Sequence, residues 1–228
     1  MRHRIAILGL VLGLGFGTPP AGAAETYQLL FREGVLSGVG ADDTLSYIAR
    51  RSGRSAPEPV EAAGQDMAPP PAELRLDLSV APGDEVILTA IRGETRQRAA
   101  TFPGSVGNPL IMYFLETVLR DMASQAGGSP FYIRNRIKDA LLRDADIRPL
   151  ALSLGGGTVA AQEVTLHPFA EDAARDRMSG FADLTLVAVV SDEVPGWYYS
   201  LTATAPAAPG EDGPGYSNAI TLLPGAAE

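Results

Sequence analysis

Several segments before residue 103 alternate apolar and polar residues, which predicts antiparallel strands. From Leu74 to Val80 every second residue is apolar, which is the pattern of a strand with one buried face. A Pro-Gly turn at 82–83 then returns the chain along a second strand, residues 86–93. Further strand-like segments cover residues 25–31, 43–50 and 95–102. We predict that the first two of these, residues 25–31 and 43–50, form an opening hairpin.

The apolar period becomes helical at Asn108. Asn108 is a good N-cap, Pro109 suits the first helical position, and Gly127 with Gly128 ends the helix. A second helix follows, in which Ser129 is the cap and Pro130 the first residue. The buried stripes of the two helices are Ile111, Phe114, Leu115, Val118, Leu119 and Met122, and then Ile133, Ile137, Ala140 and Leu141. The short Gly-Gly connection predicts that the pair folds back as a helical hairpin.

Strand patterns resume after this helix pair. Residues 149–154 and 158–169 flank a Gly-Gly-Gly turn, and a short acidic helix is expected at 170–180. Residues 183–191, 196–205 and 216–223 then read as a three-stranded meander. The order of strands, helix pair and strands lacks a parallel strand-helix-strand alternation. It therefore predicts an α+β fold, an antiparallel β-sheet or sandwich with an inserted two-helix hairpin.

Residues 1–24 have the layout of a secretory signal peptide. Two arginines precede an apolar run from Ile5 to Gly17, and small residues suited to cleavage follow. The run is shorter than the roughly 20 residues that span a bilayer, so we expect cleavage and no transmembrane segment afterwards. Residues 25–228 form one predicted domain with a mobile, proline-rich loop at 55–73. The predicted location is the periplasm of a Gram-negative bacterium.

Composition narrows the classes of function. The formal net charge of -9 argues against a nucleic-acid partner, whose phosphates need a broad basic surface. The chain has no cysteine and only two histidines, one of them in the predicted signal peptide. We therefore expect no metal site and no cofactor. No spacing typical of a catalytic motif supports an enzyme, which favours a binding or accessory protein.

The second predicted helix carries a group of cations that we call the basic cluster: Arg134, Arg136, Lys138 and Arg143. Phe131 and Tyr132 lie at its N-terminus, where free backbone N–H groups favour an anion, and Arg134, Asn135 and Lys138 share roughly one side. A carboxylate, a phosphate head group or an acidic partner loop would suit this place. The alternative is a solvated helix face neutralised by Asp139, Asp144 and Asp146.

A run of aromatic residues gives a second candidate contact. Trp197, Tyr198 and Tyr199 cannot all face one side of a strand, so at least one of them points away from the core unless both faces are covered. The alternative is that they pack under a loop. A lipid-like anionic ligand would satisfy both the basic cluster and this strand if the two are neighbours in space, and an envelope-protein partner would do so equally well.

Two other functions stay open from the residues. A hydrolase would have to use His167, with Asp172 or Asp176 to orient it, although a histidine at a strand end more often bonds local backbone. A structural envelope protein would usually show repeats or an anchor, and the sequence shows neither.

Two segments resemble known families. Residues 107–141, "GNPLIMYFLETVLRDMASQAGGSPFYIRNRIKDAL", resemble a segment of uncharacterised exported proteobacterial proteins that have no assigned activity. Residues 194–224, "VPGWYYSLTATAPAAPGEDGPGYSNAITLLP", are similar to the last two strands of fibronectin type III domains. The second resemblance implies an antiparallel C-terminal sheet and no function.

Overall fold

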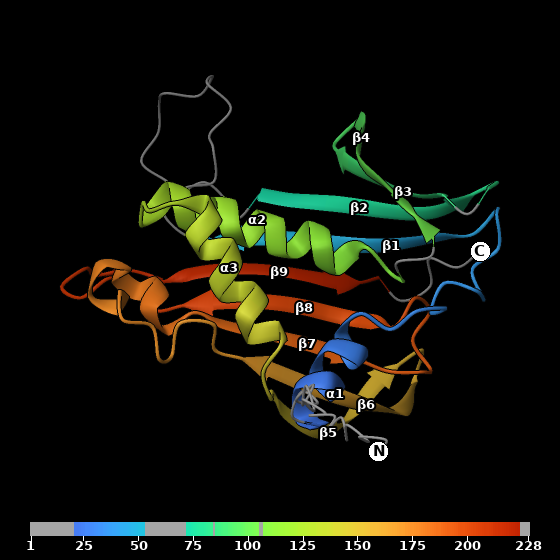
Figure 1. The fold of residues 1–228 in the computed structure, drawn as a ribbon. Helices are drawn as coiled ribbons and strands as arrows, with labels where there is room; N and C mark the ends of the chain where they lie inside the picture. Colours follow the sequence, from blue (N-terminus) through green and yellow to red (C-terminus); the bar gives the residue numbers. More distant parts are fainter. Residues whose placement is uncertain (1–20, 53–71, 84, 105–106, 224–228) are drawn as a thin grey trace, which may run out of the picture.

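One antiparallel sheet of nine strands forms the body of the protein, and three α-helices lie against one of its faces (Figure 1). This computed structural model describes residues 21–52, 72–83, 85–104 and 107–223. The predicted signal peptide up to residue 20, and the predicted mobile loop up to residue 71, lie outside the described residues. The α+β prediction is confirmed, in the form of a single sheet and not a sandwich.

The elements follow the predicted order of strands, helix pair and strands. The helices are α1 (Ala21–Leu30), α2 (Leu110–Gln125) and α3 (Pro130–Leu141). The strands are β1 (Thr44–Ser52), β2 (Ala72–Ala81), β3 (Glu85–Arg92), β4 (Thr95–Pro103), β5 (Asp146–Leu154), β6 (Gly157–Leu166), β7 (Thr185–Val190), β8 (Tyr198–Ala205) and β9 (Tyr216–Leu222). In the described part of the chain, no helix is long and apolar enough to cross a membrane.

The two halves of the chain each add consecutive hairpins to the sheet. The strand order is β4-β3-β2-β1-β9-β8-β7-β6-β5, so β4 and β5 are the edges and the last strand pairs with the first. Helices α2 and α3 connect these edges by running across one face of the sheet (Figure 1). We call this covered side the inner face.

Alternation along each strand sends the apolar residues to the inner face. On β1 and β2, Tyr47 pairs with Leu76, and on β9 and β8, Ile220 pairs with Leu201. These four side chains are almost fully buried, whereas the intervening residues of β8 and β9 are mostly serine, threonine and alanine and only half-buried. The hydrophobic core therefore lies between the inner face and the helices.

The helix pair agrees with its prediction. Of the ten residues in the two predicted stripes, only Leu115 is half-buried and the others are buried. The Oδ1 atom of Asn108 accepts the N–H of Leu110 at 3.0 Å, although the helix begins at Leu110 and not at Pro109. Ser129 occupies the N-cap position of α3, but its side chain makes no capping hydrogen bond.

The prediction of an opening hairpin is wrong, because residues 25–30 belong to helix α1. The first turn of this helix, Ala21 to Ala24, has the small residues of a signal-peptide cleavage region. The six residues that follow it are too few to show a helical period. In the structure Thr26 and Leu30, four residues apart, are both buried. The short acidic helix predicted at 170–180 is instead a pair of 3₁₀ turns, Arg175–Arg177 and Ser179–Asp183.

Candidate functional site

A small apolar cavity lies between the helices and the inner face. We call it the interlayer cavity, and its volume is about 20 Å³. All ten residues that line it are apolar: Leu30, Ile111, Phe114, Leu115, Leu141, Leu166, Leu186, Val187, Ala188 and Leu201. They come from all three helices and from β6, β7 and β8. A water molecule would fit by volume but would find no polar partner in this lining, so the space suits an apolar group.

Few polar contacts join the helices to the sheet around this cavity. No backbone hydrogen bond links a helix to a strand among the residues described. Helix α2 is held at its middle by side chains: Asp121 accepts from Arg51 at 3.3 Å and from the Tyr216 hydroxyl at 2.9 Å. Next to them the Asn218 amide donates to the Thr117 hydroxyl at 3.1 Å. The helical layer is thus attached mainly by apolar packing, with this polar cluster on α2 and two hydrogen bonds, from Trp197 and Tyr198, to the end of α1.

Asp121 is a buried carboxyl group whose surroundings act on its pKa in opposite directions. Burial is the largest effect and raises the pKa above its ordinary value, while the hydrogen bond from Tyr216 and the charge of Arg51 lower it. The folded protein therefore holds this proton more tightly than the unfolded chain does. The contribution of Asp121 to folding becomes more favourable as pH falls from above the raised pKa towards 3.8.

We expect the Asp121→Asn variant to lose this pH dependence. Urea unfolding of both proteins between pH 3.5 and 7 measures the pH dependence, because this range includes the ordinary aspartate pKa of ~3.9 and values above it. The free energy of unfolding of the wild type minus that of the variant should increase as pH falls from above the raised pKa of Asp121 towards the ordinary value. If this difference decreases instead, the ion pair with Arg51 outweighs burial and the pKa of Asp121 is lowered.

A larger cavity opens at the end of α1. Its volume is about 470 Å³, and its walls are the segment after α1, residues 32–39, and the turn between β7 and β8, residues 191–197. We call it the loop pocket. Arg32 joins the walls: its guanidinium lies 4.5 Å from the centre of the Trp197 ring and its Nη1 is 2.7 Å from Asp192. Glu33 and Glu193 add two more carboxylates to the lining.

The backbone of the loop pocket is strained at its aromatic residue. Trp197 has a φ of 79°, in the left-handed region that bulky residues rarely adopt, and it follows Gly196 at 73°. A β-bulge between Val189 and Val190 adjoins this turn. Asn108, just before α2, contacts this turn, because its side-chain amide donates to the Gly196 carbonyl at 2.7 Å. The strain is therefore maintained by contacts from another part of the chain.

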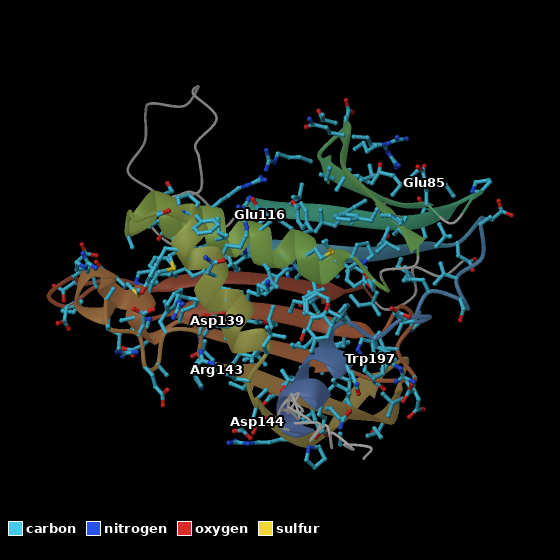
Figure 2. The ribbon with its side chains drawn as sticks, in the orientation of Figure 1. Glu85, Glu116, Asp139, Arg143, Asp144 and Trp197 are labelled. Carbon is cyan, nitrogen blue, oxygen red and sulfur yellow. The ribbon has the colours of Figure 1, made fainter. Side chains whose placement is uncertain are left out.

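The end of α1 separates the two cavities. The Leu29 carbonyl accepts from the Trp197 indole at 2.9 Å, and the Leu30 carbonyl accepts from the Tyr198 hydroxyl. The Leu30 side chain lines the interlayer cavity, whereas Arg32, two residues later, lines the loop pocket. Figure 2 shows Trp197 beside this helix end. An apolar space and a polar space thus adjoin the same turn of helix.

The predicted basic cluster is largely neutralised within the chain. Arg134 pairs with Glu116 at 3.2 Å and Arg136 pairs with Asp139 at 2.9 Å, while Arg143 donates to backbone carbonyl groups. Among the described residues Lys138 makes no ion pair. Asn135 is half-buried. Binding of an anion at this helix stays a prediction.

The two predicted aromatic groups differ in exposure. Phe131 is exposed, at 69%, and Tyr132 is exposed with its hydroxyl donating to Asp172 at 2.7 Å. Trp197 and Tyr198 are buried in the core and hold α1, and Tyr199 is half-buried. Burial and the nearby Tyr47 raise the pKa of Tyr198, which keeps its hydroxyl protonated as a donor.

The basic cluster and the aromatic strand are not neighbours. Helix α2 begins beside Gly196, through the Asn108 contact, and runs for 16 residues before the chain turns into α3. The first residues of α3 therefore lie at the end of α2 that is away from the loop pocket. Figure 2 agrees, since Glu116, the partner of Arg134, lies far from Trp197. One small ligand therefore does not contact both groups.

His167 lies at the end of β6 and is exposed. Its Nδ1 atom is 3.3 Å from the Thr185 hydroxyl, and within the described ranges it forms no hydrogen bond with Asp172 or Asp176. Asp172 instead accepts from Tyr132 and from the backbone N–H of Ala174. The hydrolase alternative thus has no assembled triad in this structure.

Comparison with known proteins gives a distant structural likeness and no family. No protein-family model matches the chain, and no curated protein matches it. Among solved structures, the crystal structure of the Mycobacterium tuberculosis lipoprotein LppX is similar with a TM-score of 0.34 and 10% sequence identity. The alignment covers 90% of this chain and 95% of LppX. A likeness this distant carries no function to this chain, and the function proposed below is inferred from the chain's own residues.

Proposed function

We propose that this protein is an exported periplasmic binding protein for a lipid-like ligand, whose apolar chain lies between the helices and the inner face of the sheet. The interlayer cavity carries this proposal, because three helices and three strands contribute only apolar residues to it. The signal-like segment at 1–24 supports export.

The closed state described here leaves room for little more than a single small group, so a bound chain requires the helices to move outwards. Each methylene removed from water contributes about 0.8 kcal/mol, so a chain of roughly ten carbons contributes about 8 kcal/mol towards that movement. Polar contacts between the layers are few, namely the cluster at Asp121 and the bonds from Trp197 and Tyr198 to the end of α1, so most of the packing to the sheet can be exchanged for apolar packing to the ligand. This is how a minor, open conformation becomes populated by a ligand.

A pair of alanine substitutions tests the proposal. Ala188 on β7 and Ala161 on β6 are equally buried, at 6%, but Ala188 lines the cavity whereas Ala161 faces the opposite side of the sheet. We expect Ala188→Met to weaken binding of the neutral apolar probe N-phenyl-1-naphthylamine by about tenfold, because the longer side chain occupies the ligand's space. Ala161→Met should leave probe binding near the wild-type value.

The protein for this measurement is expressed with residues 1–24 and recovered from the periplasm without detergent. Probe fluorescence gives the affinity, urea unfolding confirms that both variants are folded, and native mass spectrometry identifies any lipid that co-purifies. Equal probe binding by the two variants, or no binding by the wild type, would contradict a ligand site in the interlayer cavity.

A further inference from the structure

We propose that the loop pocket binds the head group of the ligand, and that this head group is a cation, an amine or quaternary ammonium group. The inference rests on the proposed function, in which the apolar chain of the same molecule lies in the interlayer cavity. Leu30 lines the interlayer cavity and Arg32 lines the loop pocket, so the end of α1 borders both spaces and one amphiphilic molecule is a suitable ligand for them.

Two features of the loop pocket favour a positive charge. The residues that line it include three with carboxylates, Glu33, Asp192 and Glu193, and a single cation, Arg32. The second feature is the ring of Trp197, because the face of an indole is the best aromatic surface for a cation.

The protein already places a cation on this ring. The Arg32 guanidinium lies over Trp197 at 4.5 Å and also pairs with Asp192 at 2.7 Å. Both partners of that pair are well exposed, at 45% and 74% of their side chains, so the contact exchanges with solvent at small cost. We interpret Arg32 as an internal substitute that holds the site until the ligand's own cation replaces it.

The strained backbone of Trp197 fits this interpretation. With φ at 79°, the residue presents its ring between the two walls while its indole N–H stays bound to Leu29. The anion that the basic cluster of α3 would attract has the opposite charge, and Figure 2 shows Glu116, the partner of Arg134, apart from Trp197. The head group of a ligand in the loop pocket is therefore not shared with α3.

Amphiphiles that differ only in head group test the charge. Dodecylammonium and dodecanoate, each below its micelle concentration, compete with N-phenyl-1-naphthylamine for the protein recovered from the periplasm. We expect dodecylammonium to displace the probe at a concentration about tenfold lower, the size of one desolvated contact between a cation and a ring. Equal competition by the two, with the neutral probe still bound, would overturn the cationic head group and leave the proposed function intact.

Variants with neutral side chains test whether the preference for dodecylammonium arises in the loop pocket. Glu33→Gln with Glu193→Gln removes two charges from the pocket and keeps the Arg32 to Asp192 pair, so the preference for dodecylammonium should fall to about twofold or less. Glu85→Gln with Glu94→Gln makes the same change in net charge on the distant β3–β4 hairpin and should keep the preference. Arg32→Gln should raise the affinity for dodecylammonium about tenfold, since the competing guanidinium is gone. A loss of affinity in Arg32→Gln would contradict the exchange of cations.

The head-group site can also be measured without any apolar chain. Trp197 is the only tryptophan of the protein, so its fluorescence reports on this pocket directly. Tetramethylammonium should change the emission of the wild type in a saturable way, and sodium at the same ionic strength should not. If tetramethylammonium binds but the neutral probe does not, the cation site stands and the interlayer ligand is wrong. No response to tetramethylammonium, together with equal competition by the two amphiphiles, removes the head-group site alone.

Discussion

Replacing Phe114 by alanine is expected to lower the free energy of unfolding by about 3 to 5 kcal/mol. Phe114 lies in the middle of the α2 stripe, is 2% exposed and lines the interlayer cavity. Removing its ring subtracts the largest side chain of that wall and enlarges a void that is already present. Because the helices pack on the sheet through apolar contacts, the surrounding residues close this space only in part. Urea unfolding followed by far-ultraviolet circular dichroism measures the change.

The matched control is Phe131→Ala, the same substitution on the neighbouring helix at a residue that is 69% exposed. It should change the free energy of unfolding by less than about 0.5 kcal/mol. A loss below about 1 kcal/mol for Phe114→Ala would mean that the cavity wall collapses readily around the missing ring. In that case the helices shift towards the sheet with little resistance, and α2 is not held in place by the ring of Phe114.

The sequence was informative where local signals and burial coincide. Asn108, Pro109 and the Gly127–Gly128 pair marked both ends of α2, because caps and left-handed glycines act over a few residues. Strict alternation identifies β2, and the Gly-Gly-Gly turn locates the hairpin of β5 and β6. Helix α1 was missed for the opposite reason, since its first turn resembles the small-residue end of a signal peptide.

The two cavities could not be predicted, because distant segments build them. The contacts of Trp197 and Tyr198 with the end of α1 span 168 positions, and Asp121 meets Arg51 and Tyr216 across 70 and 95 positions. No local pattern encodes such a pairing. The local signal is the composition of the turn, because a glycine before "WYY" indicates an unusual backbone. Trp197, Tyr198 and Tyr199 are candidate contacts from the sequence alone for this reason and because they cannot all face one side of a strand.

The clustering of attachment points at one end of α1 relates the structure to the proposed function. Trp197, Tyr198 and Arg32 all contact this turn, and the first two use backbone carbonyls that a helix end leaves free. These hydrogen bonds hold the partition between a polar and an apolar space without requiring any particular side chain on α1. A ligand that takes over the Trp197 ring would act on the same turn that lines the interlayer cavity.

Asn108→Ala is expected to lower the free energy of unfolding by about 2 to 4 kcal/mol, because it removes the one side chain that joins the start of α2 to the turn before β8. Asn108 is 4% exposed, and its amide donates to the Gly196 carbonyl at 2.7 Å while its Oδ1 accepts the N–H of Leu110 at 3.0 Å. Alanine removes both contacts: the Leu110 N–H loses its partner, while the Gly196 carbonyl keeps only the N–H of Tyr198 at 3.0 Å. A buried polar group that loses its partner costs about 1 to 3 kcal/mol.

Asn108→Ser separates the two contacts. A serine hydroxyl at this position can still accept the Leu110 N–H but is too short to reach Gly196, so it should recover about 1 kcal/mol of the loss. Urea unfolding gives the stabilities, and Trp197 fluorescence under native conditions reports on the turn, whose strained φ of 79° depends on Gly196 being held. We expect the emission to change in both variants, because neither restores the Gly196 contact. Unchanged emission in Asn108→Ala would show that the turn keeps its conformation without Asn108, and the coupling between the start of α2 and the loop pocket would then be wrong.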